Sequence, residues 1–293
     1  MSKVAVIGGG AGGMMAACIA AGNGHRVTLF EQNEKLGKKI YITGKGRCNL
    51  TNACDTEDLF AAIMKNAKFL YSAIYTFDNH ALMDYFAGLG LKMKIERGNR
   101  VFPQSDHASD VIRVLTDELH RKKVRICLNT KVQEIVSDGT KVTGVRWDCH
   151  DTHQKNQIEA FDAVVAACGG VSYPTTGSDG SGFELCKKLG HTVTELRPSL
   201  IGMTTAEEYI PQLQGLSLKN VTFYVKSGKK TLYSEFGEML FTHQGVSGPL
   251  ILTASSCIPD KYMKQELHFE IDLKPALEEE PVSYTHLRAH ETD

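Results

Sequence analysis

The sequence predicts an α/β fold in which a Rossmann-like dinucleotide-binding domain carries a β-barrel-like insert domain. Two observations predict it. The first 31 residues run through an apolar strand, a glycine-rich turn, a helix and a second strand, which is the order of a nucleotide-binding βαβ unit. After His191 the pattern changes to short strands separated by turns. A length of 293 residues suits about two domains.

Composition narrows the classes of function. The chain has 33 Lys and Arg against 34 Asp and Glu, a formal net charge of −1, and its longest basic run is Arg121–Lys123. This composition argues against nucleic acid and acidic membranes as partners. The eight cysteines form no CxxC pair, so we expect no metal site and reduced thiols in a cytoplasmic protein. The uncharged stretch Val4–Gly24 contains seven glycines and is not expected to span a membrane.

The nucleotide-binding signal begins at the N-terminus. Val4–Ile7 is an unbroken apolar run, typical of a parallel strand that is buried on both faces. A GxGxxG pattern follows at once, and Met14–Ala21 are good helix formers. The three glycines make the tight turn, admit a pyrophosphate and let the helix pack against the strand. They are Gly8, Gly10 and Gly13.

The second strand, Arg26–Phe30, ends in Glu31. A carboxylate at this position accepts hydrogen bonds from the ribose hydroxyls of an adenosine and repels a 2′-phosphate. The pattern therefore favours FAD or NAD over NADP. The loop that follows, residues 32–52, is dense in glycine, basic and amide residues. Such a loop suits a second phosphate and the flavin oxygens, although a solvated basic turn would have the same composition.

Later segments continue the α/β pattern. We expect a helical stretch over residues 55–88, a loop at Arg100–Ser105, and an amphipathic helix with an apolar face from Ala108 to Leu119. A β-meander should follow over residues 124–128, 132–137, 142–147 and 157–161, with a hairpin turn at Asp138–Gly139. In the second half, strands are expected at residues 221–225 and 231–233.

Four separated motifs resemble a known family. The opening VIGGGAGG with GKGRCNLTN, the RVFPQS segment at 100–105, the strand and double glycine at 163–170, and GEMLFTHQGVSGP at 237–249 are similar to the bacterial BaiN-type flavoproteins, also called YhiN-like, which are NAD(P)/FAD-dependent oxidoreductases. The resemblance implies a fold of the glutathione-reductase-like FAD/NAD(P)-binding superfamily and a non-covalent FAD. It also implies a set of cofactor-binding residues: Gly8, Gly10, Gly13, Glu31, Lys39, Arg47, Cys48, Asn49, Thr51, Val132, Gly169 and Gly170.

The resemblance also implies a domain plan. Residues 1–190 would form the FAD domain, 191–273 the β-rich insert, and 274–280 the start of a helical insert. Residues 281–293 look like a non-native tail, so we expect that the segment returning to the FAD domain in relatives is missing. The number of subunits is left open.

The predicted function is that of an FAD-dependent oxidoreductase that transfers hydride between flavin and a small organic substrate, such as an enone or a steroid-like molecule, with NAD(P)H as the reductant. The alternatives are an NAD-linked dehydrogenase and an incomplete, non-catalytic flavoprotein fragment. His243 is the candidate acid–base residue, because imidazole titrates near neutrality; it would equally suit a histidine that holds a loop. Cys48 and Cys54 lie too far apart in sequence for the usual helical redox pair.

Overall fold

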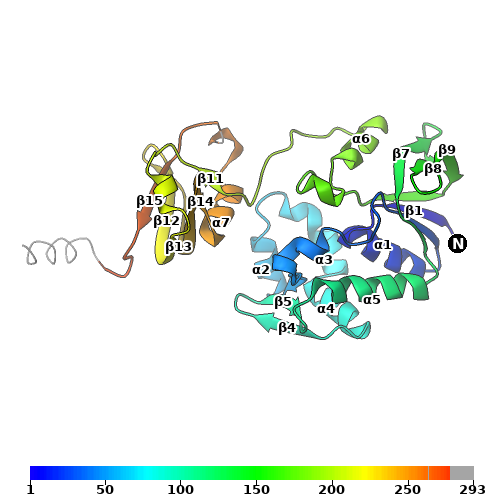
Figure 1. Cartoon of the computed structure of the whole chain (residues 1–293), viewed down its shortest axis with the longest axis horizontal. Helices are drawn as coiled ribbons and strands as arrows, with labels where there is room; N and C mark the ends of the chain where they lie inside the picture. Colours follow the sequence, from blue (N-terminus) through cyan, green and yellow to red (C-terminus); the bar gives the residue numbers. More distant parts are fainter. Residues whose placement is uncertain (263, 278–293) are drawn as a thin grey trace, which may run out of the picture. The chain divides into compact units, whose positions relative to one another are not determined.

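The computed structural model describes residues 1–262 and 264–277. They form two compact units, one over residues 1–194 and a second that begins at Glu195 (Figure 1). The predicted tail at 281–293 and the end of the predicted helical segment at 274–280 lie outside the described residues.

The first unit is built on a four-stranded parallel sheet with strand order β10-β1-β2-β6. Its strands are β1 (Lys3–Ile7), β2 (Arg26–Phe30), β6 (Arg125–Cys127) and β10 (Ala163–Ala166). Helix α1 (Ala11–Gly22) connects β1 to β2, and α5 (Ala108–Arg121) precedes β6. The prediction that residues 124–128 begin the meander is wrong: β6 pairs in parallel with β2, because the preceding helix returns the chain to the same edge of the sheet.

The parallel sheet is covered on both faces, as the apolar run of β1 predicts. Val4 and Val6 belong to a core formed with α1 and α5, while Ala5 and Ile7 belong to a second core on the opposite face. The predicted apolar face of α5 is confirmed. All five of its residues are buried: Ala108, Val111, Ile112, Leu115 and Leu119.

Residues 51–103 form a small layer beside the sheet. The predicted loop at Arg100–Ser105 is instead a strand, β5 (Arg100–Pro103), which lies between β3 (Thr51–Asn52) and β4 (Met93–Glu96). The predicted helical stretch is divided into α2 (Thr56–Ala61), a 3-10 helix (Ala67–Leu70), α3 (Tyr71–Thr76) and α4 (Asn79–Gly88). Two aspartate side chains cap helices in this stretch. Asp55 accepts a hydrogen bond from Asp58 N–H at the start of α2, and Asp78 accepts one from Ala81 N–H at the start of α4.

An antiparallel meander covers the other face of the parallel sheet. It consists of β7 (Thr130–Ser137), β8 (Val142–Cys149) and β9 (Gln154–Ala160), with the predicted turn at Gly139 in a left-handed conformation. Phe30 of β2 contacts the rings of Trp147 and Phe161 in the core between the two layers. Helix α6 (Ser181–Lys188) packs against β7.

The second unit is a five-stranded antiparallel sheet with order β11-β14-β13-β12-β15. The strands are β11 (Met203–Thr204), β12 (Ser217–Ser227), β13 (Lys230–Thr242), β14 (Gly245–Ser247) and β15 (His268–Asp272). Helix α7 (Pro249–Cys257) packs on β13 and shares a core with Phe223, Val225 and Met239.

The glycine turn gives a direct test of the fold. A Cβ on Gly13 would lie 1.7 Å from the carbonyl oxygen of Gly8, whereas a Cβ on Gly12 meets nothing within 4 Å. We expect Gly13→Ala to destabilise the chain by about 2 kcal/mol or more, because the turn must open. Gly12→Ala should gain about 0.5–1 kcal/mol, because alanine is a better helix former. Urea unfolding of both variants measures the difference; equal stabilities would contradict this packing.

Glu118 on α5 gives a test of pH dependence. The residue is 4% exposed, and its carboxylate accepts from Arg121 at 2.6 and 2.7 Å. Hydrogen bonds from Arg121 lower the pKa of Glu118, although burial opposes the shift. Its stabilising effect is therefore present above the ordinary pKa of 4.5 and is lost as the pH falls through the lowered value.

We expect Glu118→Gln to cost about 1–2 kcal/mol at pH 7. This cost should shrink steadily as unfolding is measured from pH 4.5 downwards. Asp117→Asn on the same helix is the control, because the Asp117 side chain is 67% exposed. A cost of Glu118→Gln that stayed constant down to pH 2 would contradict the assignment.

Candidate dinucleotide-binding site

A cavity of about 420 Å³ lies in the first unit beside the ends of β1 and β2. The glycine turn, the end of β2, the start of β7, and the segments 38–43 and 167–181 contribute to its lining. Ligands of open parallel sheets bind at the carboxyl ends of strands, and the volume is within the range of small-molecule sites. The predicted βαβ unit therefore does end in a cavity.

The floor of the cavity suits an anion. Gly8 has φ +106°, and a Cβ there would lie 2.5 Å from the carbonyl oxygen of Ala167, so only glycine lets these two segments approach. Helix α1 begins after Gly10, and within the described residues its first turn carries no acidic residue and no side-chain cap. Its N–H groups and partial positive charge are thus available to a phosphate.

Glu31 is held in a fixed orientation at the end of β2. It is 7% exposed; its Oε2 accepts from Gly9 N–H at 2.6 Å, and its Oε1 accepts from the backbone and side-chain N–H groups of Asn33 at 2.8 and 2.6 Å. Each carboxylate oxygen can accept more than one hydrogen bond. The carboxylate therefore keeps acceptor capacity for a ribose hydroxyl.

Three lysines bring positive charge to the cavity lining. Lys38 Nζ lies 3.1 Å from the carboxylate of Glu34. Lys39 donates to Ser178 Oγ at 2.7 Å and to Ser172 Oγ at 3.4 Å, and burial lowers its pKa. Lys131 Nζ lies 3.4 Å from Asp179. Partial burial of Asp179 opposes its ionisation, but hydrogen bonds from Ser181 and the charge of Lys131 outweigh this effect and lower the pKa to about 2. Within the described residues, Lys39 is therefore the one lysine of the lining that has no carboxylate partner, and its ammonium group can donate to an anion.

Six of the predicted cofactor residues line this cavity: Gly8, Gly10, Glu31, Lys39, Val132 and Gly169. Gly13 lies behind the turn and allows its close packing. Five others are not part of the lining: Arg47, Cys48, Asn49, Thr51 and Gly170. Their assignment to the cofactor stays a prediction.

Arg47 has partners within the protein. Its guanidinium donates to Asp106 at 2.7 Å and to Glu96, and it lies 4.1 Å from the centre of the Phe102 ring. Lys94 also pairs with Asp106. These contacts attach the GKGRCN loop to β4 and to the residues after β5. The neighbouring Cys48 is buried in the core with φ +60°, and burial raises its pKa.

Several lining residues had not been predicted. Gln32, Cys168 and Ser178 line the cavity, and so do Thr130 and Lys131, which belong to the same strand as the predicted Val132. Burial raises the pKa of Cys168 to about 11, so its thiol is protonated at neutral pH. The sequence does indicate a loop around Ser178, because the stretch SYPTTGSDGSGF at 172–183 is rich in turn residues. Its glycine and serine residues form the loop that leads into α6.

His243 is an exposed residue in the turn between β13 and β14 of the second unit. Its acid–base role stays a prediction.

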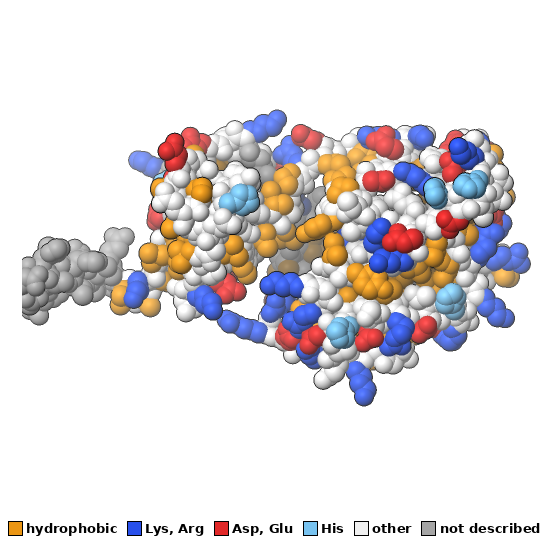
Figure 2. Space-filling view, in the orientation of Figure 1, with side chains coloured by type: hydrophobic (Ala, Val, Ile, Leu, Met, Phe, Trp, Pro, Cys, Tyr) orange, Lys and Arg blue, Asp and Glu red, His pale blue; other side chains and the backbone are white. Residues whose placement is uncertain are grey.

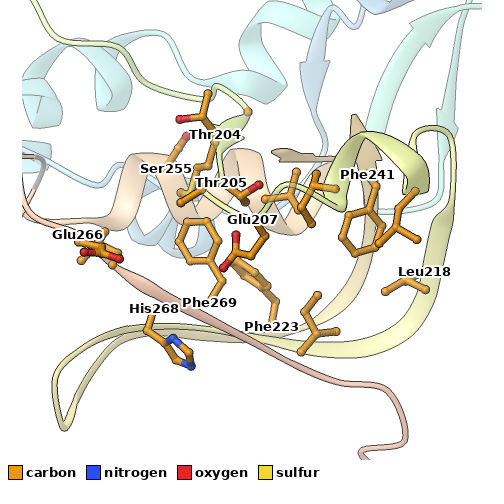
Figure 3. A pocket seen from close by; sticks show the side chains of 18 of the residues that line it. Thr204, Thr205, Glu207, Leu218, Phe223, Phe241, Ser255, Glu266, His268 and Phe269 are labelled. Atoms are coloured by element: carbon orange, nitrogen blue, oxygen red, sulfur yellow. The ribbon is translucent and has the colours of Figure 1, made fainter. Parts of the chain in front are cut away.

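The second unit has a larger cavity, of about 1110 Å³. Figure 3 shows Phe223, Phe241 and Phe269 in its lining together with the carboxylates Glu207 and Glu266. Most of its other lining residues are aliphatic or small. The lining of this cavity is therefore mainly apolar and includes a few polar groups.

Comparison with known proteins identifies the family. The chain belongs to the family of the HI0933-like protein Rossmann domain, which matches residues 2–258. It is 32% identical over 281 residues to a 3-dehydro-bile acid delta(4,6)-reductase of Clostridium scindens, covering 95% of this chain and 66% of the relative. It is 28% identical over 276 residues to a ribosomal RNA dihydrouridine synthase of Escherichia coli, covering 94% and 66%. The chain thus spans slightly less than two thirds of these relatives.

Solved structures agree on the fold. A 3-ketosteroid-delta4-(5alpha)-dehydrogenase from Rhodococcus jostii superposes with a TM-score of 0.52 at 17% identity, over 64% of this chain and 54% of that one. A flavocytochrome c3 fumarate reductase gives 0.54 at 19% identity, over 75% and 47%. The predicted family and fold class are confirmed. In the described residues, no helix has the length and apolar character needed to cross a membrane.

The lining predicts different roles for Lys39 and Arg47. We expect Lys39→Ala to weaken binding of ADP, which carries a pyrophosphate, by about tenfold, because a charged donor is lost. Arg47→Ala should leave the ADP dissociation constant within about twofold but lower the urea midpoint of unfolding, because Glu96 and Asp106 lose one of the two cations that they share and keep only Lys94.

Titration calorimetry and urea unfolding measure the two effects. Lys35→Ala is the control, since Lys35 is an exposed lysine that stacks on Tyr41. A large loss of ADP affinity in Arg47→Ala, without a loss of stability, would instead favour the phosphate contact implied by the family resemblance.

Proposed function

We propose that this chain binds FAD in the first unit and acts as part of an FAD-dependent oxidoreductase. One observation carries the proposal: the glycine turn, the first turn of α1, Glu31 and Lys39 all border one cavity. In this arrangement Glu31 would hold the ribose of the adenosine, and the turn and Lys39 would hold the pyrophosphate. FAD fits this donor set because its adenosine ribose has a free 2′-hydroxyl. When bound, a flavin supplies the group that accepts and donates hydride.

The substrate is proposed to contain a carbon–carbon double bond conjugated to a carbonyl group. The names of both relatives point to the reduction of such a bond, since a 3-oxo-delta(4,6) steroid and the uracil ring of uridine each contain one. A small organic enone, such as a steroid-like molecule, is favoured over RNA. In Figure 2, Lys and Arg side chains are interspersed with Asp and Glu over the visible face, and the net charge is −1, which gives little attraction for a polyanion.

NAD(P)H is the proposed reductant of the flavin. His243 is proposed to donate the proton that completes reduction of the double bond, as an imidazole can at neutral pH. His243→Asn should then lower turnover while the rate of flavin reduction by NAD(P)H stays unchanged. A loss in both steps would point to a role in holding the turn.

The visible spectrum of the purified chain, together with the nucleotide released by heat, tests the proposal. We expect absorption near roughly 370 and 450 nm and FAD in the supernatant. The oxidised spectrum should bleach on anaerobic addition of NADH or NADPH and recover when a 3-oxo-4-ene steroid is added. A colourless chain that fails to take up added FAD would overturn the proposal. It would favour either an NAD-linked dehydrogenase or a non-catalytic fragment.

A turnover assay compares the substrates directly. A 3-oxo-4-ene steroid and a uridine-containing RNA oligonucleotide should be offered to the reduced protein in parallel. If the RNA restored the oxidised spectrum and the steroid did not, the proposal of a small-molecule substrate would be contradicted. The proposal that the chain binds FAD would stand.

A further inference from the structure

Asn33 is in the best position to control the carboxylate of Glu31. Its side-chain Nδ2 donates to Glu31 Oε1 at 2.6 Å and to the carbonyl oxygen of Thr176 at 3.2 Å. Its Oδ1 accepts from Lys38 Nζ at 3.2 Å. These partners fix the orientation of the amide, because the reverse orientation would place Oδ1 against two oxygens and the NH₂ group against an ammonium.

The backbone of Asn33 belongs to the same network. Its N–H donates to Glu31 Oε1 at 2.8 Å, and its carbonyl oxygen accepts from Asn129 N–H at 3.0 Å. Two donors from one residue therefore hold a single carboxylate oxygen, while Gly9 N–H holds the other. Glu31 cannot rotate about its last bond without losing these hydrogen bonds.

Asn33 also connects Glu31 to the loop at residues 174–177. Its Nδ2 lies 2.5 Å from the point where a Cβ on Gly177 would stand, and Gly177 has φ +98°, so the loop can approach this closely only with glycine there. Gln32 holds the same loop by donating to the carbonyl oxygen of Gly177 at 2.8 Å. Thr176 and Gly177 both line the cavity, whereas Asn33 itself does not.

We propose that Asn33 is a positioning residue for the adenosine ribose: it sets the orientation of the Glu31 carboxylate and holds the 174–177 loop beside it. This inference rests on the proposed dinucleotide function. It assigns Asn33 no contact with the ligand. Its effect on affinity must therefore pass through Glu31, which a double-mutant cycle can measure.

The test compares Asn33→Asp with and without Glu31→Gln. The aspartate has the same shape but places a second carboxylate against Glu31, so we expect FAD to bind at least about 30-fold more weakly. In the Glu31→Gln background, the aspartate can accept a hydrogen bond from the new amide. The further loss caused by Asn33→Asp should then fall below about threefold, although Glu31→Gln weakens binding by itself.

Dissociation constants for FAD are measured by fluorescence quenching and those for ADP by calorimetry, with thermal unfolding of each variant alongside. Gln133→Ala is the matched control, because it removes one amide–carboxylate bond, to Asp148 at 3.0 Å, away from the cavity lining; its affinities should equal those of the wild type.

The outcomes separate the two proposals. An equal fold-loss from Asn33→Asp in both backgrounds, or wild-type affinity in Asn33→Asp, would overturn the role of Asn33 while FAD binding stands. If the wild type binds ADP but not FAD, the flavin function fails and the same cycle is evaluated with ADP. If it binds neither, Glu31 holds no ribose and both proposals are overturned.

Discussion

The contact between the carbonyl oxygen of Gly8 and the backbone of Gly13 is the constraint on which the nucleotide site depends. There is no room for a side chain at Gly13, so α1 can begin directly behind the end of β1. This brings the uncapped first turn of α1 next to Glu31, whose carboxylate is bonded to Gly9 N–H. The proposed phosphate site in the first turn of α1 and the proposed ribose acceptor Glu31 are therefore linked through Gly9, and neither would keep its place if the turn opened.

The correct predictions concern features that a few neighbouring residues determine by themselves. The apolar run of β1, the GxGxxG spacing and the acid after β2 each depend on a few adjacent residues, and the structure has all three. The wrong predictions concerned pairing over long distances. Residues 125–127 look like a meander strand in sequence, yet they pair in parallel with β2. RVFP looks like a loop because it contains proline, yet Pro103 ends a strand beside β4.

The site residues show the same difference between local and long-range information. Gly8 and Glu31 could be placed from the motif, because each lies in the βαβ unit, whereas Lys39 was implied by the family resemblance. Ser178 could not be placed in this way, since only the tertiary fold brings a residue more than 90 positions away to the end of β2. Arg47 shows what sequence alone leaves out: a basic residue in a glycine-rich loop suggests a phosphate ligand, and the structure adds that its guanidinium pairs with Glu96 and Asp106. Its assignment to the cofactor stays a prediction. The sequence contained no local signal for this pairing.

A crystal structure of the chain grown with FAD tests the central claim most directly. The account predicts the pyrophosphate within hydrogen-bonding distance of the N–H groups in the first turn of α1, with Lys39 Nζ beside it. It also predicts the ribose hydroxyls of the adenosine on the Glu31 carboxylate. A structure in which FAD makes no contact with the Gly8–Gly13 turn would contradict the account. So would one in which residues other than Glu31 bind the adenosine ribose.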